Sequence, residues 1–286
     1  MTRRVGLLGK PLTRRHSQVM HDAAFDAAGI DARYVLLELD AGDVPAAVAE
    51  ARASDEWLGL GVTAPYKQVV AGLVDEVEPD ARAIGAVNNV VRTDDGRLIG
   101  CNTDAPGFRA GVELAMGRSL GGADVVVMGA GGAAHAVVYA CLDAGARSVV
   151  VANRSVDRAA ALVERFATAG QGSLTALMAD DPSLAEALAA ADLAVNATTV
   201  GMIDPGATIP VGSLRPDATV FDLVYVPAET PLVAAARARG LRAANGAEML
   251  IAQAAIAFER WTGVSGTADV MRRAVAPLLA DPSVRA

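Results

Sequence analysis

The stretch Val125–Ala134, which reads VVVMGAGGAA, decides how the second half of this 286-residue chain folds. Its four leading apolar residues are typical of a strand buried on both faces of a parallel sheet. The turn that follows has the spacing Gly129-x-Gly131-x-x-Ala134 and leads into an alanine-rich segment. A strand, a glycine-rich turn and a helix in this order predict a dinucleotide-binding unit.

Each small residue of the turn has a separate expected role. Gly129 permits the tight turn, Gly131 lets the backbone approach a pyrophosphate, and Ala134 lets the helix pack against the strand. Gly132 and Ala133 open the helix, whose free N–H groups favour an anion. We therefore expect Gly129 and Gly131–Ala133 to bind the cofactor. The alternative is that the glycines serve only the sterics of a strand–helix turn.

The segment after the next predicted strand indicates which dinucleotide binds. A site that prefers NAD usually offers an acidic residue there to the ribose 2′-hydroxyl. This chain instead reads Asn153-Arg154-Ser155-Val156-Asp157-Arg158. Arg154 and Arg158 are suited to bracket a 2′-phosphate, and Ser155 is expected to cap a helix whose N-terminus attracts an anion. We therefore predict NADP, bound by Asn153, Arg154, Ser155 and Arg158. Alternatively, Arg158 only solvates a helix face.

The remaining chain alternates strand-like and helix-like segments and predicts an α/β fold. The expected domains are an N-terminal α/β substrate-binding domain (residues 1–106 plus 246–286) and a Rossmann-type, doubly wound NADP-binding domain (107–245), with a cleft between them. The expected strands are 5–8, 34–37, 57–62, 125–128, 148–152, 192–196 and 219–223, with a hairpin of 87–92 and 98–101. The expected helices are 18–28, 44–53, one following 129–134, one from 156, 249–258 and 267–279.

Composition narrows the functional class. A net charge of −8 argues against a nucleic-acid partner, which usually needs a basic patch. No apolar run reaches membrane-spanning length, and no signal peptide is expected. Cys101 and Cys141 lack metal-ligand spacing, so we expect inert thiols, no metal and a reduced, cytoplasmic setting.

Lys67 is one of only two lysines in a chain whose other basic side chains are arginine. A lysine ammonium can release a proton in a suitable environment, whereas a guanidinium cannot. Asp104 ends a short apolar run further along the chain. Placed on neighbouring loops, Lys67 and Asp104 would form a proton-transfer pair. The alternative is a surface salt bridge.

Further short motifs follow one another along nearly the whole chain. In order they are Gly9-x-Pro11, Val62-Thr63-x-Pro65-x-Lys67, Ile84-Gly85-Ala86-Val87-Asn88, Gly100-x-Asn102-Thr103-Asp104, Gly107-Phe108, the glycine-rich turn, Asn153-Arg154-Ser155, Asn196-Ala197-Thr198-Thr199-Val200-Gly201-Met202, Asp222-Leu223-Val224-Tyr225-x-Pro227, Gly246-x-x-Met249-Leu250-x-x-Gln253 and Trp261-Thr262-Gly263. Together these motifs resemble the shikimate dehydrogenase family.

The resemblance implies reversible, NADP-linked hydride transfer between shikimate and 3-dehydroshikimate. It implies that Lys67 gives or takes the proton of the carbinol oxygen and that Asp104 holds Lys67 and the substrate hydroxyl. Other positions are implied to contact substrate or nicotinamide. The implied substrate binders are Ser17, Thr63, Asn88, Tyr225 and Gln253, and the implied nicotinamide wall is Thr198, Val224, Gly246 and Met249. The polar substrate binders could instead be structural groups that satisfy loop backbone, and Thr198 and Met249 could be packing residues.

The chain departs from the family near its N-terminus. Where the family usually has Ser-x-Ser followed by Pro to grip the substrate carboxylate, this chain reads Arg15-His16-Ser17-Gln18. Arg15 is therefore a candidate substrate binder, because a guanidinium can grip a carboxylate more strongly than a hydroxyl does. It could equally fill the pocket, move the acid or point into water.

Three functions remain open. The first is shikimate oxidoreduction, and the second is action on quinate or an aminoshikimate-type ring acid, for which Arg15 is the discriminating residue. The third is a catalytically silent, NADPH-binding regulatory protein, against which the intact Lys67 and Asp104 weigh. A monomer and a homodimer are both compatible with the sequence.

Overall fold

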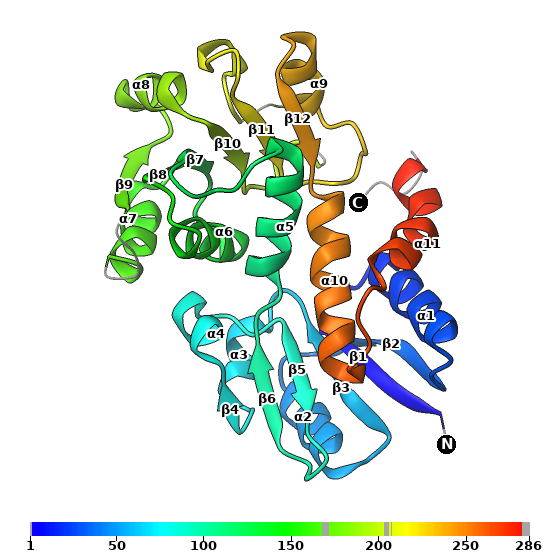
Figure 1. Ribbon diagram of the computed structural model, residues 1–286. Coiled ribbons are helices and arrows are strands. Elements are labelled where there is room, and N and C mark those ends of the chain that lie inside the picture. The colour runs from blue at the N-terminus through cyan, green and yellow to red at the C-terminus, as the bar shows by residue number, and fades with distance from the viewer. Residues whose placement is uncertain (1, 168–171, 203–205, 207, 282–286) are drawn as a thin grey trace. The chain divides into compact units, whose positions relative to one another are not determined.

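The computed structural model describes residues 2–167, 172–202, 206 and 208–281. By contacts between Cα atoms the chain divides into two compact units. Unit 1 contains Met1–Thr103 and Ile251–Leu278, and unit 2 contains Asp104–Leu250 and Leu279–Ala286. In the described residues each unit is built on one six-stranded sheet (Figure 1).

The sheet of unit 1 has the strand order β2-β1-β3-β5-β6-β4. Its first three strands pair in parallel, as the alternating pattern predicts, and the expected hairpin is present as the antiparallel pair β5 and β6. The hairpin makes this sheet mixed. The elements are β1 (Arg3–Gly9), α1 (His16–Ala28), β2 (Ala32–Glu38), α2 (Val44–Ala53), β3 (Trp57–Val62), α3 (Lys67–Ala71), β4 (Glu76–Val77), α4 (Pro79–Ile84), β5 (Asn89–Arg92) and β6 (Leu98–Cys101).

Strand direction brings four loops of unit 1 to one sheet edge. β3 runs parallel to β1 and antiparallel to β5, and β5 runs antiparallel to β6. The ends of β1, β3 and β6 and the start of β5 therefore lie at the same edge. Backbone hydrogen bonds join them there: Thr63 N–H donates to the Leu8 carbonyl (2.8 Å), and Asn88 N–H donates to the Cys101 carbonyl (3.1 Å).

An aromatic cluster closes one face of the unit 1 sheet. The ring of His21 stacks on Tyr34 at 4.5 Å between centroids and meets Trp261 edge-on at 5.1 Å. Burial lowers the pKa of His21 to about 3, so its imidazole is neutral at physiological pH. The indole of Trp261 donates to the Val90 carbonyl at 3.0 Å. Only glycine fits at Gly59, because a Cβ there would lie 2.1 Å from that carbonyl oxygen.

The sheet of unit 2 is parallel throughout, in the order β12-β11-β10-β7-β8-β9. Counted from β7, this is the 3-2-1-4-5-6 order of a doubly wound dinucleotide-binding fold. The order reverses between β7 and β10, so the glycine-rich turn after β7 lies at the switch point. The elements are α5 (Asp104–Met116), β7 (Asp124–Met128), α6 (Gly132–Asp143), β8 (Ser148–Asn153), α7 (Val156–Arg165), β9 (Ser173–Met178), α8 (Ser183–Ala190), β10 (Leu193–Asn196), the 3-10 turn η1 (Val211–Ser213), β11 (Thr219–Asp222), α9 (Pro231–Ala238) and β12 (Arg242–Asn245).

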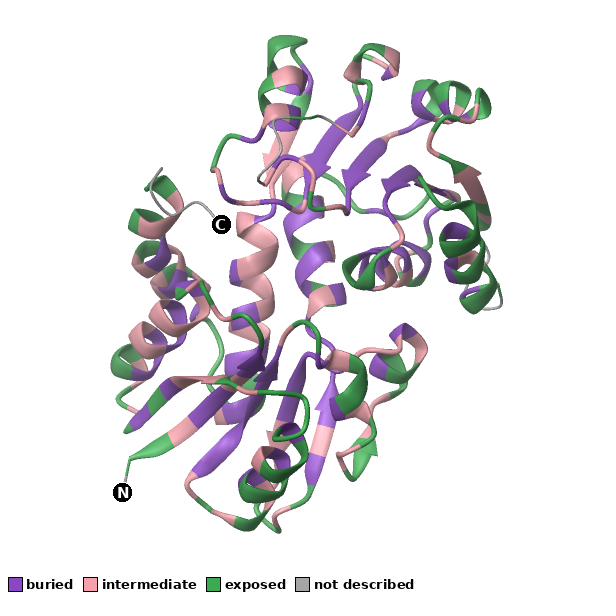
Figure 2. Cartoon of the chain, turned by 180° about the vertical axis from the view of Figure 1, so that it is seen from behind, coloured by how far each residue is buried: buried purple, intermediate pink, exposed green. Residues whose placement is uncertain are grey.

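Alternate strand residues of unit 2 face two helical layers. Val126 and Met128 of β7 join a buried cluster with Leu188 of α8 and Leu232 of α9. On the other face, Phe108 of α5 meets Phe221 of β11 edge-on at 5.7 Å. The inner strands β10 and β11 are buried along their whole length and are coloured as buried in Figure 2.

Several elements were missing from the sequence interpretation: α3, α4, α5, α8, α9, β4, β9 and β12. Two helices near the C-terminus, α10 (Ala247–Thr262) and α11 (Ala268–Ala280), are longer or shifted by a residue relative to the expectation.

Burial raises the pKa of both Cys101 and Cys141 to about 12, which makes these thiols poor nucleophiles. Within the described residues, no helix combines the length and apolarity that crossing a membrane requires.

Candidate active site and cofactor site

A buried polar network occupies the edge of the unit 1 sheet. The side-chain amide of Asn88 donates to the Thr103 hydroxyl at 3.0 Å, and its oxygen accepts from Thr103 N–H at 2.7 Å. The same hydroxyl lies 3.2 Å from the Gln253 side-chain oxygen on α10. Asn88 is therefore structural in part, which was one of its two expected roles. Its amide nitrogen has a second N–H that is not used in this bond.

The network includes residues that the sequence did not single out. Thr103 is 2% exposed and links two expected substrate binders across 15 and 150 residues of sequence. Asn102 beside it donates to the Ala86 carbonyl at 2.9 Å. The motif at residues 100–104 marked Thr103 as part of the site, but nothing in the sequence indicated that its hydroxyl contacts both Asn88 and Gln253.

Lys67 and Asp104 open helices, which corrects the expectation that they lie on loops. Lys67 is the first residue of α3, is half-buried, and its carbonyl accepts from Val87 N–H at 2.9 Å. This bond ties the start of α3 to the segment that carries Asn88. Asp104 follows Thr103 directly and is the first residue of α5. A carboxylate in the first turn of a helix is stabilised by the helix dipole.

The other expected substrate binders divide between the units. Thr63 is half-buried after β3, and Ser17 is half-buried in the first turn of α1. Arg15 is exposed at the N-cap position of α1, and its Nε donates to the Gln18 side-chain oxygen at 2.9 Å. Tyr225 belongs to unit 2, in the segment after β11, whereas the other candidates belong to unit 1.

The glycine-rich turn of unit 2 leaves room for a ligand. Gly129 has a φ of +113°, and a Cβ there would lie 2.8 Å from a methyl carbon of Thr198. A Cβ on Gly131 or Gly132 would meet no atom of the described residues within 4 Å. Ala133 is exposed, while Ala134 is fully buried against the sheet. The turn is thus packed on its protein side and open on the other, as a pyrophosphate requires.

The end of β8 presents two arginines to solvent. Arg154 and Arg158 are exposed, and in the described part of the chain neither side chain has a hydrogen-bond or ion-pair partner. The Asn153 amide donates to the Ser155 carbonyl at 2.9 Å, which fixes the bend between them. Ser155 occupies the N-cap position of α7, but its side chain makes no capping bond, contrary to expectation. These groups fit the 2′-phosphate of NADP.

A buried carboxylate joins two loops of unit 2. Asp222 is fully buried and accepts from the Asn196 amide (2.8 Å), Val224 N–H (3.1 Å) and the Thr230 hydroxyl (2.6 Å). Burial raises the pKa of Asp222, and these hydrogen bonds oppose the rise. The sequence motifs contain Asp222 and Asn196, but neither residue was expected to have a role of its own. Their signal was a polar residue at the end of each of two buried strands.

The residues expected to contact the nicotinamide lie on these loops or directly after β12. The Thr198 hydroxyl donates to the Asn196 oxygen at 2.7 Å and accepts from Val200 N–H at 3.1 Å, which agrees with its structural alternative. Gly246 N–H donates to the Val224 carbonyl at 3.3 Å. A Cβ on Gly246 would lie 2.3 Å from the Leu223 carbonyl oxygen, so the two loops approach closely. Met249 is half-buried at the start of α10.

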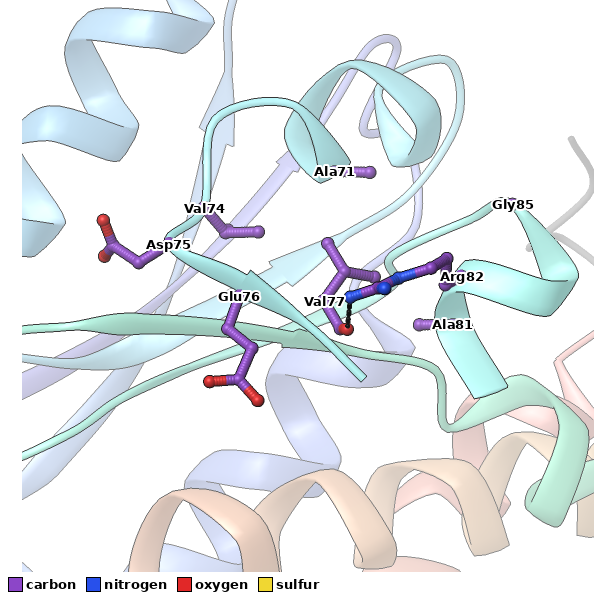
Figure 3. Close-up of a pocket in the computed structure, with 8 residues that line it drawn as sticks. All are labelled: Ala71, Val74, Asp75, Glu76, Val77, Ala81, Arg82 and Gly85. Carbon is purple, nitrogen blue, oxygen red and sulfur yellow. Dashed lines mark hydrogen bonds between the residues drawn. The ribbon is translucent and has the colours of Figure 1, made fainter. Parts of the chain in front are cut away.

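A separate pocket of about 390 Å³ lies between α3, β4 and α4 (Figure 3). Small apolar side chains line it, the carboxylates of Asp75 and Glu76 point away from them, and Arg82 donates to the Val77 carbonyl at 2.9 Å. The Asp75 carboxylate is held by Arg52 and by Leu98 N–H at 2.8 Å. None of the expected catalytic or binding residues lines this pocket, so it is not the candidate site.

Unit 2 is a doubly wound domain with an open glycine-rich turn, and unit 1 is an α/β unit with polar groups at the carboxyl ends of its strands. These features define a Rossmann-type dinucleotide-binding protein. Comparison with known proteins agrees. Residues 7–90 match the shikimate dehydrogenase substrate binding domain, 113–203 match shikimate / quinate 5-dehydrogenase, and 246–276 match the shikimate 5′-dehydrogenase C-terminal domain. The chain belongs to the shikimate dehydrogenase family.

Individual relatives cover nearly the whole chain. Shikimate dehydrogenase (NADP(+)) of Carboxydothermus hydrogenoformans is 39% identical over 96% of each chain. The Thermus thermophilus shikimate 5-dehydrogenase, solved with NADP(H) and shikimate, is 35% identical with a TM-score of 0.84, covering 96% of this chain and 99% of that one. Quinate dehydrogenase from Corynebacterium glutamicum, solved with NAD, is also 35% identical, with a TM-score of 0.88 and the same coverage.

Proposed function

We propose that this protein is an NADP-dependent dehydrogenase that interconverts shikimate and 3-dehydroshikimate. The observation that carries the proposal is the Asn88–Thr103–Gln253 network, beside which the backbone of Lys67 is anchored. Such a cluster offers amide and hydroxyl groups to a polyhydroxy ring. Relatives of the chain are named for this substrate and cofactor.

The chain supplies the proton chemistry, and NADP, when bound, supplies hydride transfer. In alcohol oxidation, Lys67 as the neutral amine takes the proton of the carbinol oxygen as the carbonyl forms, and it thereby becomes an ammonium. In ketone reduction, Lys67 returns that proton to the oxygen. Asp104 holds the ammonium of Lys67 and the neighbouring hydroxyl of the ring in place. Asn88, Thr63, Ser17, Tyr225 and Gln253 orient the ring through its hydroxyl and carboxylate groups. A positioned acid–base group of this kind typically contributes about 10²–10⁴-fold in rate.

Action on quinate or an aminoshikimate-type acid is the second candidate. It is favoured by the exposed guanidinium of Arg15 at the sheet edge and by the similarity to a quinate dehydrogenase. Initial rates with NADP⁺ and NAD⁺ against shikimate, quinate and 3-aminoshikimate separate the candidates. We expect the largest kcat/KM for shikimate with NADP⁺. A larger value for another ring acid moves the proposal to that acid, and no turnover with any of them favours a silent binding protein.

The two arginines after β8 should determine the cofactor. The Arg154→Ala, Arg158→Ala double variant is expected to bind NADPH about 100-fold more weakly, from the loss of two charge-assisted contacts worth roughly 1.5 kcal/mol each. NADH lacks the 2′-phosphate, so its affinity should change little and serves as the internal control. Fluorescence titration with both nucleotides measures this. Wild-type affinity for NADPH in the double variant would contradict the assignment of these arginines.

A further inference from the structure

We propose that Gln18 positions the guanidinium of Arg15 to receive the carboxylate of the ring acid, so that the two residues together select the acids that bind. The inference rests on the proposed function, because it concerns the substrate subsite of the same reaction. It adds a residue, Gln18, that neither the motifs nor the family comparison assigns.

A chain of two hydrogen bonds fixes the arginine. Arg15 Nε donates to the Gln18 side-chain oxygen at 2.9 Å, and the Gln18 amide nitrogen donates to the Tyr34 carbonyl on β2 at 3.1 Å. Both ends of the Gln18 amide are therefore used. A long, flexible side chain that is otherwise free in solvent is thereby linked to the sheet.

The helix that carries both residues is itself held at Tyr34. One helical turn beyond Gln18, the Asp22 carboxylate accepts from Tyr34 N–H at 2.8 Å. The ring of His21 stacks on the Tyr34 ring at 4.5 Å. Three contacts to a single strand residue prevent α1 from sliding along the sheet. The start of the helix, where Arg15 lies, is thus a fixed platform, and a preorganised group loses less entropy on binding.

The charge of Arg15 lacks a partner within the protein. Arg15 is exposed, and within the described residues no carboxylate pairs with it. By contrast, Lys10 on the same loop pairs with Asp40. The first turn of α1 has no acidic residue. With Nε bonded to a neutral amide, the two terminal amino groups of the guanidinium remain as a fork that matches a carboxylate.

The position of the pair agrees with this role. Arg15 follows β1 at the edge where the loops after β3 and β6 carry Thr63 and Thr103. In a sheet of this kind, ligands bind outside the carboxyl ends of the strands. The carboxylate of a ring acid whose hydroxyls meet Asn88 and Gln253 can then reach the exposed guanidinium of Arg15 on the loop after β1.

The test is a double-variant cycle with Arg15→Ala, Gln18→Ala and both changes together, with Arg3→Ala as the matched control. Arg3 is an exposed arginine at the opposite end of β1. Steady-state kinetics with NADP⁺ are measured for shikimate and for its methyl ester. We expect KM for shikimate to rise about 30-fold in Arg15→Ala and about fivefold in Gln18→Ala, with kcat within about threefold. The double variant should match Arg15→Ala, because Gln18 acts through Arg15.

The ester, the control and a second variant make the outcome decisive. KM for the methyl ester and all constants of Arg3→Ala should stay near wild type. Multiplying effects in the double variant, or an equal loss for acid and ester, would overturn the proposal. If Gln18→Ala does not fold, Gln18→Met keeps the side-chain length and removes both bonds. If the wild type turns over no ring acid, the proposed function fails by itself. Calorimetric titration of shikimate then tests the pair separately: tight wild-type binding that is lost in Arg15→Ala supports it, and equal binding overturns it.

Discussion

Replacement of Lys67 by alanine is expected to lower kcat by about 10³-fold, because the carbinol oxygen then loses its proton-transfer partner. KM for the ring acid should change much less, since the Asn88–Thr103–Gln253 network remains in place. Lys67→Arg should also be poor, because a guanidinium retains the charge but does not release a proton. Stopped-flow measurement of NADPH formation, with the isolated chemical step resolved from product release, gives the comparison.

The matched control is the only other lysine of the chain. Lys10 is exposed and pairs with Asp40, and Lys10→Ala is expected to keep kcat within about twofold because an exposed ion pair contributes little. If Lys67→Ala retained more than about a tenth of the wild-type rate, Lys67 would not be the acid–base group. In that case the proton would have to be exchanged through water or through another side chain.

Replacement of Asp222 by alanine is expected to lower the free energy of unfolding by about 3–5 kcal/mol, because each buried donor left without an acceptor costs about 1–3 kcal/mol. Those donors are the Asn196 amide, Val224 N–H and the Thr230 hydroxyl. Urea titration followed by circular dichroism measures the loss. The control is Asp217→Ala, which removes an exposed carboxylate beside Arg215 and should leave the midpoint almost unchanged.

Asp222→Asn separates the charge from the hydrogen bonds. The amide keeps the acceptor for Asn196 and Val224, so we expect a smaller loss than with alanine. Because burial raises the pKa of Asp222 in the folded protein, the folded state holds this proton more tightly than the unfolded chain does. The contribution of Asp222 to the unfolding free energy therefore falls as the pH rises from its ordinary pKa through the raised one. In Asp222→Asn the unfolding free energy should lose this pH dependence. If the variant and the wild type showed the same dependence of unfolding free energy on pH, titration of a buried Asp222 would be contradicted.

Local patterns predicted much of the fold. The runs at 57–62 and 125–128 are buried strands, and the helix from 44 to 53 has the expected bounds. The missed elements had weaker local signals. β9 is an edge strand without a clear buried face, β12 has four residues of mixed exposure, and α5 begins inside a motif that reads as a loop. Helices and strands can be predicted from the sequence only where burial of one face gives a regular spacing of apolar residues.

By itself, the sequence determined the dinucleotide turn, the arginines after β8, the family and the unusual residues at 15 and 18, because each of these depends on neighbours within a few positions. Only the tertiary structure decided which distant groups meet. Thr103 joins Asn88 to Gln253, Asp222 joins the loops of Asn196 and Thr230, and Gln18 links Arg15 to Tyr34. These contacts depend on strand order and register, which arise from packing the whole chain and leave no periodic trace in the sequence.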